Sequence, residues 1–199
     1  MIDGGYIMIP IGALLIVSIY IFVERCLAIN RAGKEDNTFM QRIRDYVHEG
    51  DLDSALKLCK NTDTPYSRLI MKGITRIGRP MQDVLVAIEN TGNIEVAKLG
   101  KGFTWLSTTA AGAPMLGFLG TVTGMIEAFY ALAMAGTGAN IIVLSSGIYQ
   151  ALVTTVAGLV AGILALFAYN YLVSRVNKVM TGLETKTMEF MDLLNEPAA

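Results

Sequence analysis

The longest stretch without a charge constrains this chain more than any other feature. No Asp, Glu, Lys or Arg occurs in the 47 residues from Ala128 to Ser174. Two shorter charge-free stretches cover the 20 residues from Gly4 to Val23 and the 25 residues from Gly102 to Ile126. A bilayer core of about 30 Å takes about 20 helical residues to cross. Each shorter stretch therefore suits one crossing, whereas the longest is too long for one.

Turn-forming residues divide the long stretch. The segment Gly136-Thr137-Gly138-Ala139-Asn140 is typical of a tight turn between two helices. The pattern predicts an all-α membrane protein in which the second and third transmembrane helices extend into the cytoplasm and pack with short amphipathic helices. The expected parts are a first transmembrane helix at 1–28, a cytoplasmic helical domain at 29–100, a second transmembrane helix at 101–135, a short periplasmic turn at 136–140, a third transmembrane helix at 141–170 and a cytoplasmic helical tail at 171–199.

Composition and charge placement agree with a membrane protein and predict its orientation. The chain is 53% hydrophobic, with a mean hydropathy of +0.48 and a net charge of −1. Residues 24–101 hold 13 of the 16 Lys and Arg residues, and the tail after Ser174 holds the other three. Basic loops stay on the cytoplasmic side, so the N-terminus is expected outside. The first apolar stretch lacks a basic leader and a cleavage site, which favours a retained anchor over the alternative of a removed signal sequence.

The segments outside the membrane read as amphipathic helices. Apolar stripes begin at Phe39 and Leu52, and Thr64 followed by Pro65 predicts a capped helix start. A helix from Pro80 is expected to run unbroken into the second span, and the third is expected to continue past the membrane surface. The segment between the first two spans is short and can bury only a small core of its own. This favours packing on the extended helices and on neighbouring subunits over a free-standing soluble domain.

No residue pattern predicts an active site. His48 is the single histidine and lies outside the spans, and Cys26 and Cys59 are isolated, too few for a metal cage. Neither a nucleophile and base pair nor a phosphate loop occurs in the sequence. We therefore expect no catalytic residues, no metal, no cofactor and no nucleic-acid partner, and we do not expect an enzyme.

The second and third spans each carry one stripe of small residues opposite a bulky stripe. Such stripes let helices approach closely in lipid, where association depends on packing and interhelical hydrogen bonds. Pro114 removes one backbone hydrogen bond and frees the carbonyl of Ala110, which protein or water must then satisfy. We assign helix packing to the proline and six glycines, namely Pro114, Gly117, Gly120, Gly124, Gly147, Gly158 and Gly162.

Thr121 and Thr155 each lie 17 residues from Gly138, so an antiparallel hairpin would bring them level, about 25 Å from the turn. A hydroxyl passes a proton along but does not hold one at ordinary pH. The spans contain one carboxylate, Glu127, with Gln150 nearly level with it toward the outer mouth. If protons cross here, the carboxylate at mid-depth must come from another chain. The alternative is that the hydroxyls bond only to the preceding helical turn.

Two long motifs resemble the MotA/TolQ/ExbB proton-channel family, and the ExbB and TolQ branch in particular. They are APMLGFLGTVTGMIEAF, from Ala113, and GIYQALVTTVAGLVAGILALFAYN, from Gly147. A GDL-type pattern from Gly50 to Cys59 adds to the likeness, which covers the whole chain in topology. The resemblance implies a pentameric ring around a single-span ExbD-like or TolR-like partner, whose membrane Asp would take and release protons.

The resemblance also implies roles for individual residues. The polar channel threonines of the family correspond to Thr121 and Thr155, whereas spacing alone would choose Thr154. The family's third-span Glu falls at Gln150, a departure from the pattern. Our hypothesis is that Glu127, nearly level with Gln150, supplies the missing carboxylate.

The expected function is that of a ring-forming subunit in a proton-driven motor of the bacterial inner membrane. A TonB-like protein would pass the work to transport across the outer membrane. The N-terminus would be periplasmic and the C-terminus cytoplasmic. The alternatives are a TolQ-like subunit of the Tol-Pal envelope system, a non-conducting membrane scaffold and, more remotely, an intramembrane enzyme.

Overall fold

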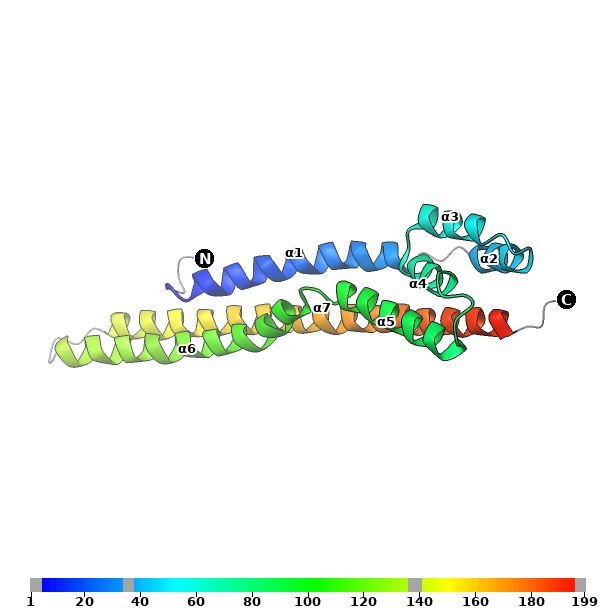
Figure 1. Ribbon diagram of the computed structural model, residues 1–199. Helices are drawn as coiled ribbons and strands as arrows, with labels where there is room; N and C mark the ends of the chain where they lie inside the picture. Colours follow the sequence, from blue (N-terminus) through cyan, green and yellow to red (C-terminus); the bar gives the residue numbers. More distant parts are fainter. Residues whose placement is uncertain (1–4, 34–37, 136–140, 196–199) are drawn as a thin grey trace. The chain divides into compact units, whose positions relative to one another are not determined.

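The regular elements in residues 5–33, 38–135 and 141–195, which the computed structural model describes, are all α-helices (Figure 1). Three of them are long and apolar enough to cross a membrane, which confirms the predicted all-α membrane fold. The predicted turn at 136–140 lies outside the described residues. The helices are α1 (Met8–Ala32), α2 (Phe39–His48), α3 (Leu52–Thr62), α4 (Pro65–Ile74), α5 (Met81–Leu99), α6 (Phe103–Ala135) and α7 (Ile141–Asn195).

The chain divides into two compact units. The membrane unit consists of Met1–Glu24 and Gly102–Leu172, and the helical unit consists of Arg25–Lys101 and Val173–Ala199. Helices α1 and α7 each contribute residues to both units. The third predicted span and the predicted tail are therefore one continuous helix.

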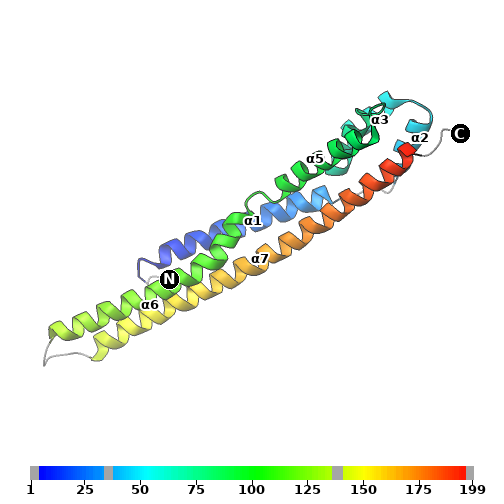
Figure 2. The same cartoon turned by 60° about the horizontal axis from the view of Figure 1, so that its bottom comes forward.

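In the membrane unit, α6 and α7 lie side by side and antiparallel, as both views show (Figures 1 and 2). Helices suit this environment because every backbone N–H and C=O in lipid must be satisfied within its own segment. A small core joins α1 to this hairpin through Ile11, Ala113 and Ala161. Farther along α1, the rings of Phe22 and of Tyr171 in α7 lie 6.0 Å apart between centroids.

The expectation of one unbroken helix from Pro80 into the second span is wrong. Helix α5 ends at Leu99, and α6 begins only at Phe103. Gly102, between them, has a φ of +91°, a backbone conformation that side-chain-bearing L residues rarely adopt. A glycine at this position therefore allows the backbone conformation that separates α5 from α6.

Side-chain caps define two helix starts in the helical unit. The Asp51 carboxylate accepts a 3.0 Å hydrogen bond from the Ser54 N–H at the start of α3. Hydrogen bonding by Ser54 lowers the pKa of Asp51. At the start of α4, Thr64 and Ser67 form a reciprocal capping box and Pro65 occupies the first turn, which confirms the predicted helix start.

The last third of α7 supplies much of the core of the helical unit. Phe190 is fully buried, and its Cδ1 would lie 3.1 Å from a Cβ added at Gly73 of α4. The Tyr66 ring packs in the same way against Gly182. The extended tail helix thus covers the apolar faces of the short helices. The buried core of the helical unit also includes Ile43, Cys59, Leu69, Ile70, Val84, Ile88, Val176, Val179 and Leu183.

The two cysteines should differ sharply in reactivity. Cys59 is 1% exposed, and its burial raises the pKa of the thiol from 9.0 to about 12, whereas Cys26 is half-buried. Because the thiolate is the reactive form, we expect iodoacetamide at pH 8.5 to modify Cys26 well before Cys59 in the folded protein, as mass spectrometry of tryptic peptides will measure. Equal rates at both cysteines would contradict the burial of Cys59.

The raised pKa also sets the direction of a pH effect. The folded state keeps Cys59 protonated at pH values where the unfolded chain already ionises it. This contribution to stability is fully present below pH 9 and is lost as the pH rises toward about 12. Thermal unfolding of a Cys59→Ala variant should therefore depend less on pH in that window than unfolding of the wild type.

Candidate functional site

The candidate site is the contact between α6 and α7 in the membrane unit. A Cβ added at Gly117 would lie only 3.2 Å from the Cα atoms of both Gly158 and Thr155. This close approach of the two backbones depends on the missing side chains, because an ordinary residue would push the helices apart. The other residues assigned to packing also lie at this contact, as shown by the pairs Gly120 with Thr154, Gly124 with Ala151, Gly147 with Ala128, and Gly162 with Pro114.

Pro114 lies opposite Gly162. A Cβ added at Gly162 would be 2.7 Å from the proline Cδ and 3.0 Å from the carbonyl oxygen of Ala110. Pro114 has no N–H, so the Ala110 carbonyl lacks its usual helical hydrogen-bond donor. The freed carbonyl thus lies close to the backbone of α7 at Gly162.

Thr121 and Thr155 lie side by side across the hairpin. Their hydroxyl oxygens are in hydrogen-bond contact with each other. Each also approaches the Gly117 carbonyl oxygen, at 3.2 Å from Thr121 Oγ1 and 3.1 Å from Thr155 Oγ1. Thr155 Oγ1 is in addition 3.4 Å from the Ala151 carbonyl oxygen. Since a hydroxyl carries one hydrogen, the pair can donate only two of these bonds at a time.

Thr154 has a different environment from its neighbour. It is 1% exposed, and its Oγ1 donates a 2.9 Å hydrogen bond to the Gln150 carbonyl of its own helix. Its Cβ would be 3.0 Å from a Cβ at Gly120, so the side chain fills the helix contact. Thr155, beside it, is only half-buried. The Thr155 hydroxyl lies within hydrogen-bond distance of Thr121 and of the Gly117 carbonyl, both on α6.

The structure does not join Glu127 to Gln150 by a hydrogen bond within the described residues. Both side chains are exposed on the surface of the single chain. The Gln150 amide instead lies against the N-terminal segment, where a Cβ at Gly5 would be 2.8 Å from Nε2. A polar side chain exposed at membrane depth requires a partner or water, because lipid offers it no hydrogen bonds.

Several buried polar residues were not identified from the sequence, and three of them are Ser18, Thr109 and Glu95. Ser18 of α1 is 3% exposed, and its hydroxyl has no hydrogen-bond partner among the described residues. Thr109 is fully buried and donates to the Trp105 carbonyl. Glu95, in the helical unit, is 5% exposed and paired with two bases. The burial of Glu95 could have been predicted only from its position in line with the buried residues of its helix. Its charge predicts the opposite, because charged side chains are seldom buried.

Three apolar helices, two of them closely packed through glycines around a pair of hydroxyls, define a multi-pass membrane protein with a polar contact inside its spans. The MotA/TolQ/ExbB proton channel family matches residues 61–185. The chain belongs to this family, in its ExbB and TolQ branch. It is a family of proton channels rather than of enzymes.

Relatives named as ExbB proteins and a relative named as TolQ both support the assignment to this branch. The ExbB-like 1 biopolymer transport protein of Synechocystis is 31% identical over 90% of this chain and 71% of its own length. The biopolymer transport protein ExbB of Neisseria meningitidis is 29% identical, over 90% of this chain and 87% of its own. The Tol-Pal system protein TolQ of Haemophilus influenzae is also 29% identical, over 92% and 85%.

Proposed function

We propose that this chain forms the ring of a proton-driven motor in the bacterial inner membrane and couples proton flow to TonB-dependent transport across the outer membrane. The observation that carries the proposal is the contact between the Thr121 and Thr155 hydroxyls at membrane depth. These hydroxyls relay a proton between donors and acceptors that the chain itself does not supply. Similarity to ExbB proteins supports the coupling to biopolymer transport.

A second chain is part of this proposal. Glu127 is the only carboxylate in the described parts of α6 and of α7 up to Ser174. An ExbD-like or TolR-like protein with one span and a membrane Asp would provide the titrating group, inside a ring of five copies of this chain. The proton path would then include Thr121 and Thr155, with Gln150 and Glu127 toward the periplasmic mouth and Thr154 in a packing role. The N-terminus would be periplasmic and the C-terminus cytoplasmic, in line with the basic residues at 24–101.

A TolQ-like role in the Tol-Pal envelope system is the second candidate function. The similarity to TolQ, at 29% identity over 92% of this chain, favours it as much as the similarity to ExbB favours the first. Purification of the chain from its own cells will distinguish the two roles. A TonB-like protein in the complex supports the first role, and a TolA-like protein supports the second.

Replacing the two threonine hydroxyls by methyl groups tests the proton path. Thr121→Val and Thr155→Val keep the branched shape but remove a hydrogen bond worth about 1.5 kcal/mol, so we expect proton flux to fall about tenfold for each variant. The measurement is proton uptake by vesicles that contain the complex with its partner. Thr155→Ser retains the hydroxyl and should restore most of the flux.

Thr123→Val is the matched control, because Thr123 is half-buried as Thr155 is, but in the described structure its hydroxyl bonds to the Leu119 and Gly120 carbonyls of its own helix. It should conduct as the wild type does. If Thr121→Val and Thr155→Val also conduct normally, the hydroxyl pair is not on the path. In the same assay Glu127→Gln should lower the flux, and an unchanged flux would show that Glu127 does not replace the carboxylate missing at Gln150.

A further inference from the structure

A charged cavity lies in the helical unit, apart from the proposed proton path. Its volume is about 280 Å³. The end of α1 forms one wall, and the start of α4 and the last turn of α5 form the others. Its ionisable lining consists of four bases and two acids, namely Arg25, Arg31, Arg68, Lys98, Asp63 and Glu95.

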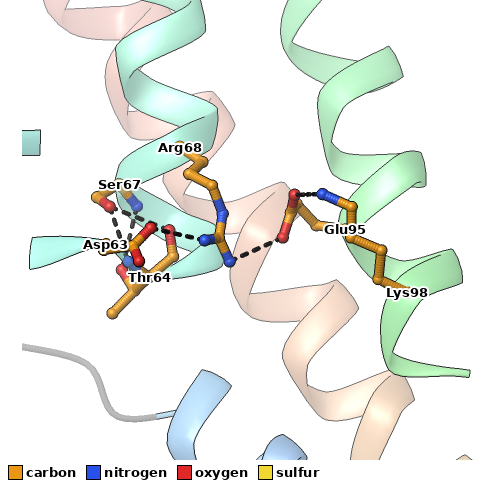
Figure 3. Close-up of polar contacts among 6 residues, drawn as sticks. All are labelled: Asp63, Thr64, Ser67, Arg68, Glu95 and Lys98. Atoms are coloured by element: carbon orange, nitrogen blue, oxygen red, sulfur yellow. Dashed lines mark hydrogen bonds and ion pairs between the residues drawn. The ribbon is translucent and has the colours of Figure 1, made fainter. Parts of the chain in front are cut away.

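Each of the two carboxylates in this lining is already paired (Figure 3). Arg68 bridges them, with Nη1 at 2.7 Å from Asp63 Oδ1 and Nη2 at 3.0 Å from Glu95 Oε2. The other oxygen of Glu95, Oε1, forms an ion pair with Lys98 Nζ at 2.7 Å. Four bases against two acids leave an excess of two positive charges among the lining side chains. The cavity is therefore suited to an anion.

A donor without an acceptor points to the same chemistry. The Nε of Arg68 is buried and has no hydrogen-bond partner among the described residues. A buried N–H without a partner costs free energy, and an anionic oxygen that accepted a hydrogen bond from it would relieve that cost. Guanidinium groups bind phosphate oxygens in paired hydrogen bonds, and three of the four bases here are arginines.

The position of the cavity along α1 indicates where such an anion comes from. The charge-free stretch of α1 ends at Val23, and Arg25 lies two residues later in the same helix. At 1.5 Å per residue, Arg25 and Arg31 extend from about 3 to 12 Å beyond the apolar stretch, which is the depth of lipid head groups. Basic pockets at this depth recognise anionic lipid head groups.

We propose that this cavity binds a phosphate group, carried by an anionic phospholipid or by a free phosphate anion, with Arg31 and Arg25 as its main ligands. Arg68 serves as a third donor and is held in place by Asp63 and Glu95. The site goes beyond the proposed proton path, because none of its residues belongs to the hairpin of α6 and α7. A bound phosphate group would stabilise the packing of the end of α1 against α4 and α5 within the helical unit.

The test uses the purified full chain in a non-ionic detergent. Dioleoylphosphatidylglycerol, dioleoylphosphatidylcholine and inorganic phosphate are titrated separately, and the midpoint of thermal unfolding reports binding. We expect phosphatidylglycerol to raise the midpoint in a saturable way and phosphatidylcholine to raise it much less. Inorganic phosphate that reproduces the shift would identify a free anion as the ligand, whereas a shift with phosphatidylglycerol alone would identify a lipid.

Arg31→Gln should weaken phosphatidylglycerol binding about fivefold, the effect of one arginine near a membrane surface. Arg31→Lys, which keeps the charge, should lose less. Arg44→Gln is the matched control, because Arg44 is an exposed arginine of α2 that does not line the cavity. Arg25→Gln is a second variant, although it also removes a hydrogen bond to the Lys98 carbonyl.

Three results would overturn the proposal. The first is wild-type binding by both Arg31→Gln and Arg25→Gln. The second is an equal loss in Arg44→Gln, which would indicate attraction to the surface as a whole. The third is equal stabilisation by phosphatidylcholine and phosphatidylglycerol with none from inorganic phosphate, which would indicate contacts with the acyl chains instead.

Discussion

Gly158→Ala is expected to destabilise the membrane unit by about 1 to 3 kcal/mol, although alanine is the better helix former. A Cβ at Gly158 would lie 2.5 Å from the Ala113 carbonyl oxygen and 2.8 Å from the Gly117 Cα. Both are backbone atoms of α6, so no side-chain rotation relieves the clash. The helices must separate, and the Thr155 hydroxyl would then lose the Gly117 carbonyl. Unfolding in mixed micelles with increasing dodecyl sulfate will measure the loss.

The same helix pair offers a matched control. Gly112 lies within α6, and a Cβ added there meets no atom within 4 Å in the described structure. Gly112→Ala should therefore be neutral or stabilising by up to about 1 kcal/mol, from helix propensity alone. If the two substitutions changed stability equally, close packing at Gly158 would not hold the hairpin together.

Glu95→Gln is expected to destabilise the helical unit by about 1 to 3 kcal/mol. Removing one member of a buried ion pair leaves its partners without compensation, and Glu95 serves both Arg68 and Lys98 (Figure 3). The side chains of Arg68 and Lys98 are 36% and 63% exposed, so water screens part of the interaction and the cost lies below that of a fully buried pair.

Glu89→Gln provides the comparison for Glu95. Glu89 is on the same helix but exposed, and its loss of charge should change stability by less than about 0.5 kcal/mol. Chemical unfolding followed by circular dichroism will compare both variants with the wild type. Equal stability of Glu95→Gln and the wild type would show that the ion pairs contribute nothing net.

Sequence reasoning succeeded where one strong physical demand acts on a local stretch. Lipid requires long apolar helices, so the three spans were predictable from charge-free stretches alone. The start of α4 was predictable because Thr64 and Pro65 act within a single turn. Equal spacing from Gly138 predicted that Thr121 and Thr155 lie level, and their hydroxyls are in contact. Their role in proton transfer stays a proposal.

The misses share a different cause, since each depends on residues distant in sequence or on backbone conformation. The break before α6 depends on the left-handed backbone conformation of Gly102. That conformation cannot be predicted from the presence of a glycine in an apolar pattern. Glu95 was missed because one of its two partners, Arg68, lies on another helix. Ser18 reads as an ordinary small residue of a span, and only the packing of α1 reveals a buried hydroxyl.

The shared hydrogen bonds mean that the orientation of each threonine hydroxyl would depend on the proton that it last passed on. Two hydrogens serve the pair, and each hydroxyl either points at its neighbour or at a carbonyl of Gly117 or Ala151. A proton that enters at one hydroxyl and leaves from the other reverses this order. Both hydroxyls must then rotate back before a second proton can follow in the same direction. If protons pass through this contact as proposed, transfer would therefore proceed in single, separated events.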